Sequence, residues 1–538
     1  MQLLAPALVG LLATEIATAQ FQTQSSPAPL GNFGASVAGI GDVDFDGVPD
    51  YAVGGTTLAL PGSGNGAGAV LAYSGATGAA LWGASGSGGW IPCGGSGTTG
   101  DNFGAAIVRI PDVNGDGLDD LAVGAPNFSV GSGSCRVAGY GRLYILDATT
   151  GLTILEITES TASLAPRDFF GARIKRGTDT NFDGIDEFVV MSARRAYVFD
   201  GSSPSSFLTV TLNVGEAVAT TAGDVDGNGF ATEIAIGNPT SNQVRIVDLN
   251  FPTTTTISGP ASSFFGAELE YAPAVGPTGA EGVLIGAPQQ GSGAGAVHFL
   301  PTGGTVGVIS TGSLGDGLGN AIAFGGNADA DGLADDALVG ARSGNYVRLL
   351  DLGGTTIRDV AQPGGSAFGA SVAWIGQIVP NSFDEFVVGD PGTAAGGQAD
   401  AFYGGPSASV DQAFGPGFHP TGGAVPMLTQ SAALVPGASM TASVAAPGAI
   451  ARPVVLYWGL SSTTGVPFGG GTIWMDPSFG PFLRASGATN AAGNWTSLPL
   501  SLPLDPNLVG LSIAHQAGVG LPGGAVALSN ATESVIGW

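Results

Sequence analysis

The stretch Phe33-Gly-Ala-Ser-Val-Ala-Gly-Ile-Gly-Asp-Val-Asp-Phe-Asp-Gly-Val-Pro-Asp-Tyr-Ala-Val-Gly54 contains the pattern that decides the fold. A short apolar run over 35–40 precedes an acidic loop over 42–50, and a second apolar run follows over 51–54. Two more runs, at 69–75 and 79–82, stand between Gly-rich turns. Short apolar runs bounded by Gly and Asp are typical of β-strands, and helical periodicity is absent. The stretch therefore predicts a unit of four short strands.

The same pattern returns along the chain as far as residue 405. Phe-Gly-Ala opens five units and weaker copies open two more, and the openings lie at Phe33, Phe103, Phe170, Gly215, Phe265, Leu318 and Phe368. Four-stranded units arranged around an axis hide the strand edges that one flat sheet would expose. The repeat therefore predicts an all-β chain with a seven-bladed β-propeller.

A second motif accompanies the Phe-Gly opening. Val123-Gly-Ala-Pro126 and Ile285-Gly-Ala-Pro288 close the second strands of their units. Together the two motifs resemble FG-GAP repeats, which form the N-terminal propeller of integrin alpha chains and occur in many bacterial surface proteins. The resemblance extends over residues 31–405. It implies a seven-bladed propeller with calcium in the loop between the first and second strands.

The acidic loop of unit 1 has the composition of a calcium site by its own chemistry. Calcium takes six to eight oxygen ligands at about 2.3–2.6 Å. Carboxylates occupy loop positions 1, 3, 5 and 9, at Asp42, Asp44, Asp46 and Asp50. Gly47 allows a tight turn, and Val48 would offer its backbone carbonyl. Without a cation, carboxylates this close would repel one another.

Three further units share this spacing, and a fourth is related to it. Unit 2 has Asp112, Asn114, Asp116, Leu118 and Asp120; unit 3 has Asp179, Asn181, Asp183, Ile185 and Glu187; unit 6 has Asn327, Asp329, Asp331, Leu333 and Asp335. Unit 4 has Asp224, Asp226, Asn228 and Glu233, with one extra residue before the glutamate. Asp-Gly hairpin turns without an ion are the alternative. Because the spacing recurs in four loops, we predict Ca²⁺ there and a fifth Ca²⁺ in unit 4.

Units 5 and 7 depart from the pattern. The segment from Tyr271 to Glu281 has no alternating carboxylates, and the segment 377–385 keeps only Asn381 and Glu385. We therefore expect no metal in these two loops.

The N-terminus has the features of an export signal. The apolar run from Leu3 to Ala13 is shorter than the roughly 20 residues that a membrane-spanning helix needs. Ala17-Thr18-Ala19 offers a cleavage site before Gln20. A buried first strand or helix is the alternative. The sequence predicts a signal peptide over 1–19, no transmembrane segment, and a secreted or cell-surface protein.

Cys93 and Cys135 are the two cysteines of the chain. In an exported protein a single pair favours a disulfide, and the alternative is two free thiols. Both lie in long loops on the face of the propeller opposite the acidic loops. We predict a Cys93–Cys135 disulfide.

The charge of the chain excludes two classes of partner. With 42 acidic and 15 basic residues, the net charge is −27. Few side chains could neutralise phosphates, so nucleic acid is excluded as a partner. A bare anionic membrane surface is excluded on the same ground.

The face opposite the acidic loops carries the largest loop insertions. Loops on a rigid scaffold often bind ligands, and exposed aromatics and arginines dominate many interfaces. The candidate ligand contacts are Trp90, Arg136, Tyr140, Arg194 and Arg195. Loops without any ligand are the alternative.

Residues 416–538 follow the propeller, which we place at 20–415. Short β-rich runs such as Pro453-Val-Val-Leu-Tyr-Trp458 alternate with Pro and Gly breaks. About 120 residues of this kind predict a C-terminal β-sandwich.

The predicted function is adhesion to, or binding of, an extracellular protein or glycan by a secreted or surface calcium-binding propeller. No Gly-x-Ser-x-Gly, P-loop or His-Glu-x-x-His motif occurs. Two alternatives stay open. One is a hydrolase or lyase acting on an extracellular polysaccharide or ester through carboxylates in the propeller channel, and the other is a structural envelope protein. The sequence gives no indication of the oligomeric state.

Overall fold

The structure, a computed structural model, is nearly all β. It describes residues 20–405 except 30, 92–98, 130–138, 159–167, 252, 275–280, 330, 363–365 and 379–382. In the C-terminal part it describes 412–415, 426–430, 439–446, 452–468, 471–475, 482–490, 492, 494–497, 500–501, 512–521, 526–529 and 531–535. No helix among these residues is long and apolar enough to span a bilayer.

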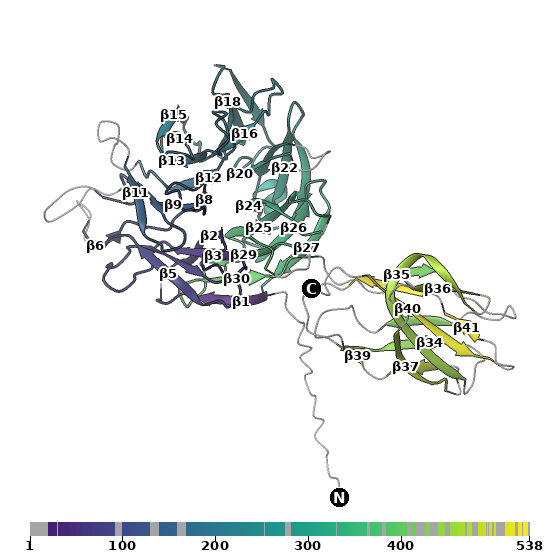
Figure 1. The fold of residues 1–538 in the computed structure, drawn as a ribbon. Coiled ribbons are helices and arrows are strands. Elements are labelled where there is room, and N and C mark those ends of the chain that lie inside the picture. Colours follow the sequence, from purple (N-terminus) through teal and green to yellow (C-terminus); the bar gives the residue numbers. More distant parts are fainter. Residues whose placement is uncertain are drawn as a thin grey trace, which may run out of the picture. The chain divides into compact units, whose positions relative to one another are not determined.

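Residues 20–405 form a seven-bladed β-propeller, as the repeat predicts (Figure 1). Each blade is a four-stranded antiparallel sheet. Blade 1 contains β2 (Phe33–Gly41), β3 (Asp50–Gly55), β4 (Ala69–Tyr73) and β5 (Ala80–Ser85). Blade 2 contains β8 (Ile107–Ile110), β9 (Asp120–Ala125), β10 (Arg142–Leu146) and β11 (Thr153–Ile157). Blade 3 contains β12 (Arg173–Arg176), β13 (Phe188–Met191), β14 (Arg195–Phe199) and β15 (Ser206–Thr211).

The remaining blades follow the same order. Blade 4 contains β16 (Val218–Gly223), β17 (Glu233–Asn238), β18 (Gln243–Asp248) and β19 (Thr254–Ser258). Blade 5 contains β20 (Glu268–Ala272), β21 (Gly282–Gly286), β22 (Ala296–Pro301) and β23 (Gly307–Thr311), with a one-turn helix α1 (Gln290–Gly293) before β22. Blade 6 contains β24 (Leu318–Gly326), β25 (Asp336–Ala341), β26 (Tyr346–Asp351) and β27 (Thr356–Ala361). A short hairpin, β6 (Gly88–Trp90) with β7 (Thr99–Gly100), links blades 1 and 2.

Blade 7 closes the ring with a strand from the other end of the domain. Its own strands are β28 (Ser371–Gly376), β29 (Glu385–Asp390) and β30 (Gln398–Phe402). The fourth is β1 (Gln20–Ser25), which pairs antiparallel with β30. The first and last segments of the propeller are therefore joined by backbone hydrogen bonds, and β1 begins at the residue that follows the predicted cleavage site.

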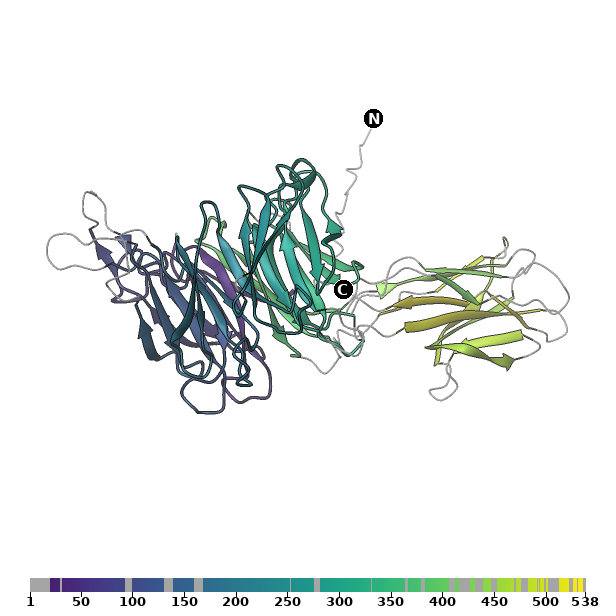
Figure 2. The same ribbon diagram turned by 90° about the horizontal axis from the view of Figure 1, so that it is seen from above.

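The apolar core lies between neighbouring blades. The second strands β3, β9 and β25 are buried along their whole length, whereas the outer strands β5 and β11 are mostly exposed or half-buried. One cluster joins Ile110 and Leu143 of blade 2 to Phe170, Phe188 and Val190 of blade 3. The short apolar runs form strands because both of their faces are covered by adjacent blades (Figure 2).

The Phe-Gly and Gly-Ala-Pro motifs meet where one blade contacts the next. Gly171 of the third opening lies against Gly124 of blade 2, and a Cβ added at Gly124 would lie 1.9 Å from the Gly171 oxygen. Phe170 forms a parallel bridge with Gly141, and a Cβ added at Gly141 would lie 2.1 Å from the Phe170 backbone oxygen. The glycines are therefore required by close approach of two backbones.

The opening phenylalanine packs edge-on against an aromatic ring of its own third strand. The pairs are Phe33–Tyr73, Phe103–Tyr144, Phe170–Tyr197, Phe265–His298 and Phe368–Phe402, at centroid distances of 5.0–6.3 Å. His298 thus takes the place of an aromatic residue in blade 5, and its Nε2 lies 2.7 Å from Gln290 Oε1. His298 is thus a structural residue of the third strand of blade 5.

Residues 406–538 form a separate compact unit. Its main sheet contains β31 (Gln412–Gly415), β35 (Pro453–Phe468), β36 (Gly471–Met475), β37 (Phe482–Ala488), β40 (Ser512–Gly520), β41 (Val526–Leu528) and β42 (Ala531–Val535). Smaller sheets contain β32 (Met427–Gln430), β34 (Ala442–Ala445) and β38 (Asn494–Thr496), and β33 (Ser439–Met440) with β39 (Leu500–Ser501). One core cluster joins Leu428 and Val444 of the three-stranded sheet to Val454, Leu456 and Val519 of the main sheet.

The division of the chain falls after Gly405, whereas the sequence placed it after residue 415. The difference arises because β31 belongs to the C-terminal unit, where it pairs with β42.

Candidate calcium loops

The five acidic loops connect the first and second strands of blades 1, 2, 3, 4 and 6. In each loop the glycine at position 6 has a left-handed backbone, with φ between 88° and 93°, at Gly47, Gly117, Gly184, Gly229 and Gly332. A Cβ at any of them would meet nothing within 4 Å. These glycines are therefore present for their backbone conformation, which curls the loop.

The curl directs backbone N–H groups at the first carboxylate of the loop. Asp42 Oδ1 accepts from Asp46 N at 3.0 Å, and Asp42 Oδ2 accepts from Gly47 N at 2.9 Å. Asp112 and Asp179 accept equivalent hydrogen bonds from their loops. The loop shape is thus the same in blades 1, 2 and 3.

The last carboxylate of each loop is buried and lies at the start of the second strand, or directly before it in blade 3. Asp50 is 0% exposed; its Oδ2 accepts from Val43 N at 2.8 Å and its Oδ1 from Gly75 N at 2.9 Å. The equivalent residues are Asp120, Glu187, Glu233 and Asp336, each at most 1% exposed. One carboxylate per loop is therefore removed from water.

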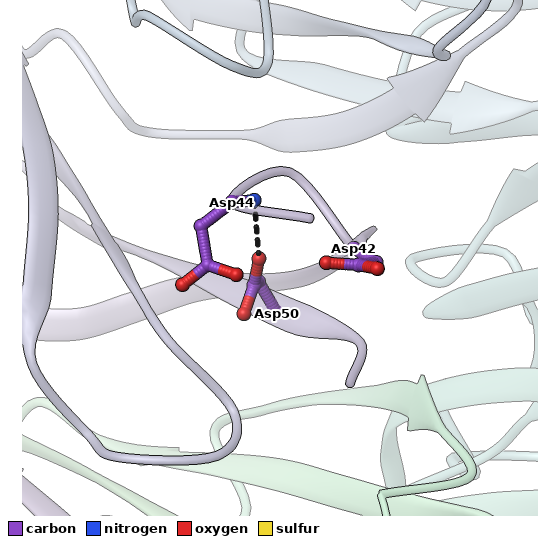
Figure 3. A group of neighbouring side chains, drawn as sticks. All are labelled: Asp42, Asp44 and Asp50. Atoms are coloured by element: carbon purple, nitrogen blue, oxygen red, sulfur yellow. Dashed lines mark hydrogen bonds between the residues drawn. The ribbon is translucent and has the colours of Figure 1, made fainter. Parts of the chain in front are cut away.

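The carboxylates of a loop converge on one point. Oxygens of Asp42, Asp44 and Asp50 lie within 4.8 Å of one another (Figure 3). Two further groups meet the same criterion, one of Asp179, Asp183 and Glu187, and one of Asp224, Asp226 and Glu233.

Several of these oxygens have an unused lone pair in the described part of the chain. Glu187 Oε1, Asp224 Oδ1, Glu233 Oε2 and Asp336 Oδ1 are buried and accept no hydrogen bond there. Buried polar atoms are normally paired, so these oxygens call for a partner. Converging carboxylate oxygens are the ligands that Ca²⁺ prefers, and the residues present fit this ion.

Burial makes the ionised form of these carboxyl groups costly without a cation. It raises the pKa of Asp50 and of Asp120 to about 6 despite backbone hydrogen bonds. Burial, with the nearby charge of Asp226, raises the pKa of Glu233 to about 8, and burial raises the pKa of Asp336 to about 8. A bound cation would remove this penalty.

Unit 6 places its last carboxylate one residue later than the sequence suggested. Asp336 pairs with Gly326 as Asp50 pairs with Gly41, and Asp336 Oδ2 accepts from Ala328 N at 2.5 Å. Asp335, the residue chosen from the sequence, precedes this position and is half-buried. In blade 1 the buried Asp50 lies four residues before Gly54 of the second strand. The same count back from Gly340 in blade 6 leads to Asp336.

The loops of blades 5 and 7 differ from these five. Gly282 occupies the position of the buried carboxylate in blade 5, because it pairs with Ala272. In blade 7 Glu385 takes that position and is 0% exposed, and Asn381 lies outside the described residues.

The proposed ligand contacts are only partly described. Arg136, Cys93 and Cys135 lie outside the described residues, and of Trp90 only the backbone, in β6, is described. Arg194 lies in the tight hairpin between β13 and β14, and Arg195 is the first residue of β14. The Arg194 side chain is 59% exposed, and its Nε lies 3.9 Å from Asp168 Oδ1. Tyr140 is half-buried and its backbone N donates to Phe128 O. By topology Tyr140, Arg194 and Arg195 are on the face opposite the acidic loops.

The central channel encloses a cavity of about 810 Å³ lined by first strands of the blades. Lys175 Nζ lies 2.6 Å from Glu268 and 2.7 Å from Glu270, and Arg173 lies 2.8 Å from Glu268. Burial opposes the charge on Lys175, but the two glutamates outweigh it and raise its pKa. Burial would also raise the pKa of Glu268, but Lys175 and Arg173 lower it. Lys175 and Glu268 therefore stabilise each other's charged forms, whereas burial raises the pKa of Glu270 despite the nearby charge of Lys175.

Comparisons with known proteins agree with the fold. Residues 103–146 match the FG-GAP repeat family. A segment of 151 residues is 30% identical to mouse (Mus musculus) integrin alpha-E, covering 26% of this chain and 13% of that protein. The chain therefore spans about an eighth of the length of this curated relative.

Solved structures with a similar arrangement are distant in sequence. BBS1N, in a complex with ARL6DN, is 11% identical with a TM-score of 0.43, covering 71% of this chain and 96% of that one. Regucalcin from Agrobacterium tumefaciens, described as a calcium-binding protein, is 11% identical with a TM-score of 0.34, covering 72% and 95%.

Proposed function

We propose that this chain, an integrin-alpha-like FG-GAP propeller, is an extracellular binding module whose propeller is stabilised by five Ca²⁺ ions. The observation that carries the proposal is the recurrence of one loop geometry in five blades. Each loop curls around a left-handed glycine and ends in a buried carboxylate, and in the loops of blades 1, 3 and 4 the carboxylate oxygens lie within 4.8 Å of one another. In three loops, buried oxygens lack a hydrogen-bond partner among the described residues.

The ligands in each loop are carboxylate or amide oxygens at positions 1, 3 and 5, a backbone carbonyl at position 7, and the buried carboxylate. In unit 6 the buried ligand is Asp336. Calcium supplies the positive charge that allows these carboxylates to be ionised at the same time. The ligand-binding surface is the calcium-free face, where Arg194 is exposed on a short, rigid hairpin.

Calcium stoichiometry tests the metal assignment. Purified protein is dialysed against millimolar Ca²⁺, and the metal that it holds in excess of the dialysis buffer is counted by elemental analysis, before and after treatment with a chelator. We expect about five ions per chain before chelation. A count near zero would contradict the assignment.

Ligand binding is tested on an array of extracellular matrix proteins and glycans, with and without Ca²⁺. We expect specific binding that Arg194→Ala weakens without changing the melting temperature. An array with no specific signal in either condition would contradict the binding function.

A further inference from the structure

The two blades without a calcium loop contact the calcium loops of the blades that precede them. In blade 5, Glu281 Oε1 accepts from Asp224 N, the first residue of the blade 4 loop, at 3.1 Å. In blade 7, Asp384 Oδ2 accepts from Asn327 N, the first residue of the blade 6 loop, at 2.9 Å. Both contacts join residues 57 positions apart. The same relation therefore occurs twice in the ring.

Each contact is supported by its surroundings. Tyr271 donates its hydroxyl to Glu281 Oε1 at 2.9 Å and so orients the carboxylate. Gly223 leaves room for it, because a Cβ there would lie 1.8 Å from Glu281 Oε1. In blade 7, Asp384 N donates back to Asn327 O at 2.8 Å, which makes the pair reciprocal.

In blades 2 and 3, the residues at the position of Glu281 and Asp384 have partners within their own blade. Asp119 and Asp186 also come directly before the buried carboxylate of their blades. Asp119 pairs with Arg109 of its own blade at 2.8 Å, and Asp186 pairs with Arg176 of its own blade at 3.1 Å. The register position of these arginines in the first strand is occupied by Tyr271 in blade 5 and by Trp374 in blade 7.

We propose that Glu281 and Asp384 are positioning residues for calcium in the loops of blades 4 and 6. This inference rests on the proposed function. Each carboxylate holds the backbone of the first ligand residue, so that its side chain is aimed at the ion before the ion arrives. Preorganised ligands bind more tightly because less order must be imposed on binding. Preorganisation matters most in the loops of blades 4 and 6, because each has one more residue before its buried carboxylate than the loops of blades 1, 2 and 3.

The test measures the calcium dependence of each loop separately. Hydrogen exchange of the whole protein, followed by mass spectrometry, gives a calcium midpoint for the peptide covering each loop. We expect Glu281→Ala to raise the midpoint of the blade 4 loop by about 2- to 30-fold, the range that corresponds to losing a side-chain cap on a backbone N–H. Asp384→Ala should do the same in blade 6, and the midpoints of blades 1, 2 and 3 should stay unchanged.

Two further variants distinguish a positioning role of Glu281 from a general effect on the stability of the protein. Glu281→Gln keeps an oxygen acceptor and should restore the blade 4 midpoint to within about twofold of the unmodified protein, a rescue that does not require the charge. Asp119→Ala is the matched control and should leave the midpoint of the blade 1 loop unchanged. If Glu281→Ala fails to fold, Tyr271→Phe removes the hydrogen bond that orients the glutamate and should shift the blade 4 midpoint while the midpoints of blades 1 and 2 stay unchanged.

Each outcome decides between the two proposals. An unchanged blade 4 midpoint in Glu281→Ala or Tyr271→Phe, with normal calcium protection of blades 1, 2 and 3, overturns the positioning role and leaves calcium binding intact. Equal shifts in all loops also overturn it, because they indicate loss of overall stability. Absence of calcium protection in every loop overturns the calcium assignment and this inference with it.

Discussion

Asp50 and its equivalents are buried carboxyl groups, and keeping them ionised costs free energy unless a cation is bound. Each of these carboxylates lies at the start of a second strand or directly before it and is at most 1% exposed: Asp50, Asp120, Glu187, Glu233 and Asp336. Backbone N–H groups satisfy part of each carboxylate, as Val43 and Gly75 do for Asp50. The remaining oxygens would face the ion, so the properties of the apo protein should depend on pH.

In the calcium-free protein we expect stability to fall as pH rises from about 4 to about 8. Unfolded carboxyl groups have pKa values near 4, whereas burial raises the pKa to about 6 at Asp50 and to about 8 at Glu233. Between these values the folded state binds more protons than the unfolded state, so raising the pH favours unfolding. Thermal melting of metal-stripped protein at pH 5, 6.5 and 8 measures this, and a melting temperature that rises across the range would contradict it.

Asp46→Ala should remove calcium stabilisation from blade 1. At ten times the dissociation constant, one site contributes about 1.4 kcal/mol, and the variant should lose about that much of the calcium-dependent free energy of unfolding. Urea unfolding with calcium and with chelator measures the difference. Phe45→Gly is the matched control: Phe45 is 73% exposed, has φ 61° and is no ligand, so its replacement should preserve the calcium effect.

The residue types of the loops were predictable from sequence, but one position was not. Alternating carboxylates and a central glycine identify loops 1, 2 and 3 directly. In unit 6 the adjacent Asp335 and Asp336 both fit a buried position, and only the strand register shows that the loop is one residue longer. Glu281 and Asp384 were missed because their partners belong to a neighbouring blade, and spacing within a unit carries no signal for that.

Contacts between blades depend on glycines that allow two backbones to touch. Gly124→Ala should destabilise the propeller by about 1–3 kcal/mol, because its Cβ would lie 1.9 Å from the Gly171 oxygen and one backbone must shift. Gly307→Ala is the control, since a Cβ there meets nothing within 4 Å. Urea denaturation compares the two variants. Equal stability would contradict the role assigned to the Gly–Gly contact.

The strand order within blades 1 to 6 was also predictable, because short apolar runs between Gly and Asp turns leave few alternatives. The pairing of the Phe-Gly phenylalanine with an aromatic of the third strand was not predicted. A signal was present, since Tyr73, Tyr144 and Tyr197 recur in third strands. This pattern is incomplete, because His298 in blade 5 and Phe402 in blade 7 stand at the position of the tyrosine.

Closure of the ring is a property of the whole molecule that no single repeat encodes. β1 supplies the outer strand of blade 7, and its register runs from Gln20↔Phe402 to Ser25↔Gln398. The repeat predicts that blade 7, like every other unit, contains four strands of its own, and it predicts no role for residues 20–25. A segment of six residues has no partner in its own neighbourhood, so its place becomes clear only when the ring is assembled.

Deleting residues 20–25 should open the ring. The edge of β30 would then be exposed, and exposed edges promote association. We expect a lower melting temperature together with higher-order species in size-exclusion chromatography. Replacing Gln22 and Gln24 by alanine is the control: it removes side-chain hydrogen bonds to Gly75 and Gly78 but keeps the backbone pairing. A deletion variant as stable and monodisperse as this control would contradict closure by β1.

The central claim is that calcium holds the propeller together, and thermal melting tests it most directly. Five sites at ten times their dissociation constants would contribute about 7 kcal/mol, comparable to the net stability of a whole domain. The protein is melted in millimolar calcium and again in excess chelator at the same pH and ionic strength. We predict a melting temperature at least roughly 10 °C lower in chelator. An unchanged melting temperature would contradict the account and identify the loops as Asp-Gly turns without an ion.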